Sequence, residues 1–128
     1  MTKTQSLGIL FSKAVERLAE SLQAPKSDIT RDSAIQRFEF CVDLSWKLVK
    51  TVLEEEKGIL CNSPKDCFRQ AYRQGLVKHD ATYLLLVDMR NETVHTYNEE
   101  IAARIYRRLP VALKQFKSLL KILKRSNQ

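Results

Sequence analysis

Arg90 and His95 are the side chains of this sequence whose types and spacing could perform chemistry together. A histidine takes up and releases protons near neutral pH, which is the task of a general acid or base. The planar guanidinium of an arginine matches the oxygens of a phosphate and stabilises charge that develops on them. Cleavage of RNA with its own 2′-hydroxyl as the nucleophile needs these two kinds of group and no metal ion. The pair is therefore suited to metal-independent ribonuclease chemistry.

The helix expected to carry this pair, residues 81–95, also allows an ordinary structural role for each residue. Its helical projection is apolar on most sides, which predicts packing on most sides. The cation of Arg90 in such a setting requires a partner or a route to solvent. Glu39 interrupts the apolar seam of the helix predicted at 30–57 in the same way. We therefore predict that Glu39 faces Arg90 across the fold. On this alternative, Arg90 is an ion-pair partner and His95 interacts with the end of its own helix.

Three segments of the chain, in their order and spacing, resemble one known superfamily. The segment RNETVHTY at 90–97 resembles the Arg-x4-His-x-Tyr motif of HEPN domains. The segment HTYNEE at 95–100, with QRFEF at 36–40 and WK at 46–47 upstream, resembles the nucleotidyltransferase substrate-binding branch of that superfamily. The resemblance covers nearly the whole chain.

The resemblance implies a metal-independent endoribonuclease without a cofactor, whose site lies in a cleft between the two protomers of a homodimer. His95 would then be the general acid or base, Arg90 the phosphate clamp and Asn91 a polar support, with Glu39 supporting Arg90. A dimer makes chemical sense, because one histidine per chain does not easily serve as both acid and base. The RNA target, whether tRNA or mRNA, stays open.

The resemblance also implies a protein partner, a minimal nucleotidyltransferase that acts as antitoxin to this chain as toxin. Tyr97 resembles the tyrosine that such a partner adenylylates, and the added anion would shut the site. The structural alternative is that Tyr97 fixes the loop before the last helix. Two rival functions remain: a non-catalytic subunit that presents a substrate to the nucleotidyltransferase, and a helical scaffold without a site.

Length and apolar periodicity predict one all-α domain over residues 1–128. Helices are expected at about 4–24, 30–57, 64–74, 81–95 and from 99 onward, arranged as an antiparallel up-and-down bundle of four long helices with one short additional helix. Gly58 should end the second helix, Ser63, Asp80 and Asn98 should cap the third, fourth and fifth, and Pro110 should kink the last. Trp46 and the other aromatic residues outside the motif are expected in the core.

The positive charge of the chain lies in its second half. The net charge is +7, and residues 65–128 hold thirteen basic and six acidic residues, whereas residues 1–64 hold nine of each. A stripe on the outer face of the last helix is a candidate surface for RNA or for the partner protein; it consists of Lys114, Lys117, Lys121 and Lys124. The alternative is an ordinary solvated helix face.

The cysteines and the apolar runs indicate a cytoplasmic protein. Cys41, Cys61 and Cys67 are odd in number and share no metal-ligand spacing with the two histidines, so three reduced thiols and no metal site are expected. No signal peptide is recognisable, and no apolar run approaches the roughly 20 residues that span a bilayer. The sequence thus predicts no association with a membrane.

Overall fold

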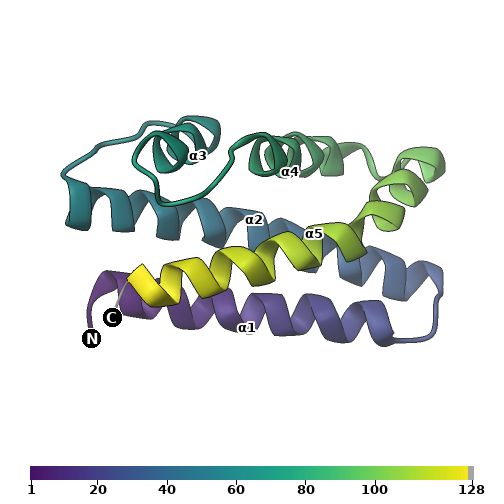
Figure 1. Cartoon of the computed structure of the whole chain (residues 1–128). Helices are drawn as coiled ribbons and strands as arrows, with labels where there is room; N and C mark the ends of the chain where they lie inside the picture. The colour runs from purple at the N-terminus through teal and green to yellow at the C-terminus, as the bar shows by residue number, and fades with distance from the viewer. Residues whose placement is uncertain (127–128) are drawn as a thin grey trace.

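The computed structural model describes residues 1–126, and its described part is built from helices alone (Figure 1). The elements are α1 at Lys3–Gln23, α2 at Asp28–Lys57, α3 at Pro64–Arg73, α4 at Ala81–Glu92, the 3-10 turn η1 at Thr93–His95, and α5 at Glu99–Ser126. The long helices α1, α2 and α5 pack along one another, while α3 and α4 follow each other along the other side of α2. The all-α prediction is confirmed, and α3 and α4 together fill the fourth position of the bundle.

Most helix ends follow the local signals of the sequence. The side chain of Ser63 caps α3 and that of Asn98 caps α5, both by accepting hydrogen bonds from backbone N–H groups. Gly58 ends α2 with a left-handed φ of 66°. Asp80 occupies the predicted N-cap position of α4, but its backbone angles are helical and its side chain makes no capping hydrogen bond.

The core of the bundle is centred on three phenylalanines from the three long helices. The ring of Phe116 on α5 lies 6.1 Å from that of Phe11 on α1 and 6.0 Å from that of Phe38 on α2, measured between centroids. All three side chains are fully buried. A second group joins α3 to α4, where Phe68 stacks on Tyr83 at 5.2 Å. These contacts hold the helices that carry the motif.

The prediction that the remaining aromatic residues are core is wrong for two of them. Phe40 is 41% exposed and Tyr72 is 50% exposed. Phe40 follows the buried Phe38 by two residues, and such a step on a helix turns the side chain to another face. Trp46 is only partly buried, and the Lys50 ammonium lies 6.0 Å from the centre of its ring.

A disulfide joins Cys61 to Cys67, so the prediction of reduced thiols is wrong for these two residues. Cys61 lies in the loop just before α3 and Cys67 lies in the first half of that helix, with the two Cα atoms 5.1 Å apart. This separation lies within the range that a disulfide spans. Cys41 is free and buried, and burial raises the pKa of its thiol to about 12.

The last helix, α5, runs through Pro110 without ending there. Figure 1 shows α5 bending between its first turns and the longer part that follows, in the sense expected of a helix that contains a proline. Among residues 1–126, no helix is long and apolar enough to cross a membrane.

Candidate functional site

The motif helix ends earlier than the sequence predicts. α4 stops at Glu92, and residues 93–95 form a 3-10 turn in place of a last α-helical turn. Two threonine hydroxyls explain the tighter turn: Thr93 donates to the carbonyl of Arg90 at 2.7 Å, and Thr96 donates to the carbonyl of Thr93 at 2.9 Å. His95 consequently lies on a turn between two helices, where its ring can be reached from outside.

The guanidinium of Arg90 is held by carboxylates of α2. Its Nε and Nη2 donate to the two carboxylate oxygens of Asp43 at 3.1 and 3.3 Å, and its Nη1 lies 3.5 Å from Glu39. Nη1 also donates to the Thr93 hydroxyl at 3.1 Å. The hydrogen bond with Asp43, then the charges of Asp43 and Glu39, raise the pKa of Arg90 against the opposing effect of burial. The predicted contact between Glu39 and Arg90 is therefore present.

Asp43 is the partner that the sequence reasoning missed. It lies four residues after Glu39, which places both side chains on one face of α2. This spacing was the available signal, and an arginine that needs a partner could have been assigned to the pair. Because two carboxylates surround one guanidinium, the surroundings of Arg90 carry no net positive charge.

The other motif residues face outward. His95, Asn91 and Tyr97 are all exposed, Tyr97 to 83%. The rings of His95 and Tyr97 meet nearly at right angles with their centres 6.1 Å apart. The side chains of His95 and Asn91 form no hydrogen bond within the part of the chain that the structure describes. Both are thus free to bind a group that comes from outside.

The prediction that α4 packs on most of its sides is wrong. Leu85 is 60% exposed and Val94 is 65% exposed, although both are apolar. Since α4 covers α2 with one side only, its opposite side lacks a neighbour. We call the exposed apolar side chains of Phe40 on α2, Leu85 on α4 and Val94 on η1 the motif surface.

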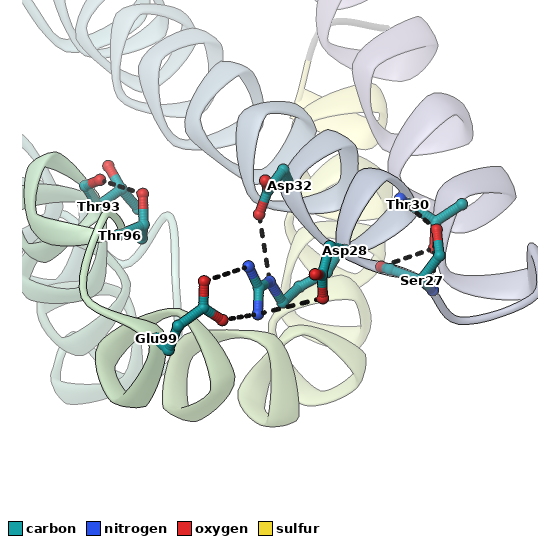
Figure 2. Close-up of polar contacts among 8 residues, drawn as sticks. Ser27, Asp28, Thr30, Asp32, Thr93, Thr96 and Glu99 are labelled. Carbon is teal, nitrogen blue, oxygen red and sulfur yellow. Dashed lines mark hydrogen bonds and ion pairs between the residues drawn. The ribbon is translucent and has the colours of Figure 1, made fainter.

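A buried arginine fixes the loop that follows His95. Arg31 is only 9% exposed, and its guanidinium contacts Glu99 at 2.7 Å and Asp32 at 3.1 Å, with Asp28 at 3.9 Å. Figure 2 shows these three carboxylates converging from the starts of α2 and α5. The hydrogen bond to Glu99 is the largest contribution that raises the pKa of Arg31. This contact fixes the start of α5, and with it one end of the loop at 96–98.

Glu99 should make the stability of this corner depend on pH. The hydrogen bond from Arg31, and then its charge, lower the pKa of Glu99 in the folded state. The contribution of this contact to the unfolding free energy is therefore fully present above the ordinary pKa of a glutamate. It is lost as the pH falls through the lowered pKa of Glu99. We expect wild-type protein to lose more unfolding free energy than Glu99→Gln on acidification, in denaturant titrations at a series of pH values. Equal losses in both proteins would show that the contact contributes nothing.

The lysine stripe lies apart from the motif. Its four side chains are exposed on the second half of α5, which Figure 1 shows leading away from the end of α4. Each lysine lacks an ion-pair partner among residues 1–126. The structure therefore does not bring the stripe and the motif into one site within a single chain.

Known proteins resemble the chain over most of its length. A protein of Haemophilus influenzae named probable ribonuclease HepT is 36% identical over 99 residues, which are 74% of this chain and 68% of that one. A crystal structure of a Thermus thermophilus protein is 37% identical, with a TM-score of 0.79 over 92% of this chain and 99% of the other. The tri-AMPylated HEPN toxin of Shewanella oneidensis, solved in complex with an MNT antitoxin, has a TM-score of 0.80 over 98% and 99% of the two chains. At 16% identity it shows a common fold alone.

The family assignment rests on the length of the match. The family described as nucleotidyltransferase substrate binding protein like matches residues 9–125, which include every element that carries the motif. The chain belongs to this family, and it has the fold of the solved HEPN toxin.

Proposed function

We propose that the chain is the HEPN toxin of a toxin–antitoxin pair and that it cleaves RNA without a metal ion. One observation carries the proposal: His95 is exposed and free of hydrogen bonds, within the described residues, on a turn next to an anchored arginine. The relative from Haemophilus influenzae, named probable ribonuclease HepT and 36% identical, supports the same reaction.

The reaction would use the 2′-hydroxyl of RNA as its nucleophile. A base removes the 2′-hydroxyl proton, the oxygen attacks the adjacent phosphorus, and an acid gives a proton to the departing 5′-oxygen. The products are a 2′,3′-cyclic phosphate and a 5′-hydroxyl. His95 fits either proton-transfer role. Arg90 stays 28% exposed and would contact the phosphate, while Asn91 offers a further hydrogen bond.

A homodimer would supply two histidines to one cleft. The motif surface contains three exposed apolar side chains, whose burial by a second copy would be favourable. Two copies joined there would bring both His95 rings to the same interface, so that one could act as base and the other as acid.

A minimal nucleotidyltransferase is the proposed partner and antitoxin. The family is described by its likeness to the substrate-binding protein of a nucleotidyltransferase, and the solved toxin from Shewanella oneidensis is AMPylated in complex with its MNT antitoxin. Tyr97 is the residue we propose for this modification here. Its exposed hydroxyl is accessible to another protein, and an added nucleotide would obstruct the approach to His95.

Replacing Tyr97 by phenylalanine should separate activity from regulation. Tyr97→Phe keeps the ring and removes the acceptor oxygen, so it should remain active and be more toxic than wild type when the nucleotidyltransferase is co-expressed. Mass spectrometry of co-expressed wild-type protein should show added AMP on Tyr97. If the wild type carries no such mass and Tyr97→Phe is restrained equally well, the partner must act by covering the cleft.

Reversing the charge of the lysine stripe should weaken RNA binding. Glutamate at all four positions should lower affinity and reduce the dependence of affinity on salt, because each neutralised phosphate releases a counterion. The control reverses four other exposed lysines, Lys3, Lys13, Lys47 and Lys78, which keeps the net charge equal. Equal RNA affinity of the two variants would assign the stripe to solvent or to the partner protein.

The second candidate function is a non-catalytic subunit that presents a substrate to the nucleotidyltransferase. The description of the family favours it, and so does the pairing of Arg90 with two carboxylates, which occupies the proposed phosphate ligand. Purified wild-type protein, sized by chromatography, should be incubated with tRNA and total RNA in the presence and absence of EDTA. Cleavage that resists EDTA supports the toxin, whereas intact RNA after incubation with a clean dimer supports the binding subunit.

A further inference from the structure

A polar pocket of about 500 Å³ opens beside the motif loop, and the cleavage step described above makes no use of it. Its lining comes from one face of α2 and from the loop before α5, and consists of Asp32, Ser33, Ile35, Gln36, Glu39, Thr96 and Tyr97. The volume lies within the usual range of small-molecule sites. The pocket is large enough to hold one planar base.

The α2 wall of the pocket is a row of hydrogen-bonding groups. Asp32, Gln36 and Glu39 follow one another at helical spacing, so that an amide stands between two carboxylates. Arg31 contacts Asp32 at 3.1 Å, and Arg90 lies 3.5 Å from Glu39, so each carboxylate has a cation behind it. The amide of Gln36 makes no hydrogen bond to any residue from 1 to 126. It can therefore both donate and accept toward a ligand.

The loop wall of the pocket offers an aromatic face. Tyr97 lines the pocket and is 83% exposed, and its ring centre is 6.1 Å from that of His95. Proteins that bind single-stranded RNA stack bases on such exposed rings and read their edges with polar side chains. A phosphate would be repelled by the two carboxylates, so the group that enters is a base and not the backbone.

We propose that this pocket binds a guanine of the RNA, stacked on Tyr97 and read by Asp32 and Gln36. Guanine is the standard base with two adjacent donors, N1–H and N2–H, which match the two oxygens of one carboxylate. Its O6 then accepts from the amide of Gln36. Asp32 suits this role because its side chain is 63% exposed, whereas that of Glu39 is 28% exposed and faces Arg90. Uracil has only one N–H donor on this edge, so it would fill only one of the two carboxylate oxygens. Cytosine and adenine have a ring-nitrogen acceptor beside their amino group, and this acceptor would face a carboxylate oxygen and be repelled by it.

This assignment rests on the proposed function and names its substrate class as RNA that carries guanine next to the cut. Because the rings of Tyr97 and His95 touch, a base on Tyr97 would place a neighbouring phosphate near His95. Cleavage should then occur at a fixed distance from a guanine. Tyr97 and Gln36 would select the site, and His95 would perform the chemistry.

Binding of single nucleotides tests the pocket without any cleavage. The 5′-monophosphates of guanosine, adenosine, cytidine and uridine share a phosphate and differ in the base, and each is titrated into isotope-labelled full-length protein. We expect GMP to shift the side-chain amide signals of Gln36 and to bind about tenfold or more tightly than UMP. Gln36→Leu and Asp32→Asn should lose this preference, while Gln74→Leu, at another exposed glutamine, keeps it.

Two results would overturn the assignment: equal binding of GMP and UMP, or a GMP preference that survives in both Gln36→Leu and Asp32→Asn. Sequencing of the ends cut from a random RNA pool separates this inference from the proposed function. Cleavage without a guanine preference contradicts the pocket alone, whereas absent cleavage contradicts the ribonuclease and leaves the nucleotide titration to decide the pocket.

Discussion

His95→Ala should lower the rate of RNA cleavage by about 10²–10⁴-fold, because it removes the proposed proton-transfer group. The fold should be unaffected, since the His95 side chain is exposed and makes no hydrogen bond within residues 1–126. The dimer should persist, because the apolar side chains of the motif surface are its proposed contacts. Single-turnover cleavage of a labelled RNA, together with a thermal unfolding curve, measures both effects. In cells, the variant should have lost its toxicity.

His79→Ala is the matched control for this experiment. His79 is the only other histidine of the chain, and its ring stacks on Tyr83 at 5.5 Å, near the junction of α3 and α4. It should keep full cleavage activity. If His95→Ala cleaves as fast as His79→Ala, the activity does not come from His95 and the proposed mechanism fails.

Removing Arg90 should have the largest effect on stability. Arg90→Ala leaves the carboxylates of Glu39 and Asp43 next to each other without their cation, and hydrogen bonds to charged groups contribute about 1.5–3 kcal/mol. We expect the unfolding free energy to fall by about 2–3 kcal/mol, a value from the same range. Arg90→Lys keeps the charge and loses the bidentate fork, so it should be partly destabilised and severely impaired in cleavage.

A solvated ion pair serves as the control for Arg90. Arg17 lies 3.4 Å from Glu20 on α1 with both side chains about two-thirds exposed, and such pairs contribute roughly 0–1 kcal/mol. Urea titrations should show Arg90→Ala to be clearly less stable than Arg17→Ala, and Glu39→Gln less stable than Glu20→Gln. Equal stabilities within each pair of variants would show that the contacts of Arg90 do not stabilise the fold. If Glu39→Gln alters cleavage alone, the contact serves the site and not the fold.

The helical framework could be predicted because its signals are local. Apolar spacing placed the helices, and short polar signals at Ser63, Gly58 and Asn98 placed most of their ends. The contact between Glu39 and Arg90 was also predictable, because each residue interrupts an apolar surface and an unpaired charge there is costly. These inferences needed only the order of residues within one or two helices.

Some of the missed features depend on how distant segments meet, and others on local contacts that apolar periodicity does not register. The spacing of Glu39 and Asp43 could have assigned both to Arg90, but which of the two contacts it most closely depends on how α2 and α4 pack side by side. The disulfide joins residues six positions apart, and it was missed because an odd number of cysteines without metal-ligand spacing favoured reduced thiols. The early end of α4 came from threonine hydroxyls that compete for carbonyl groups, a local effect that apolar periodicity does not register. Arg31 and Glu99 are 68 positions apart, and no spacing in the sequence indicated that they would be in contact.

The chemistry of the cut ends tests the central claim most directly. Purified wild-type protein is incubated with a defined RNA in excess EDTA, and the new ends are identified by mass spectrometry. The account predicts 2′,3′-cyclic phosphates and 5′-hydroxyls, produced by wild type and not by His95→Ala. Ends that carry a 5′-phosphate, or cleavage that stops when EDTA is added, would contradict attack by the 2′-hydroxyl with His95 as its proton-transfer group.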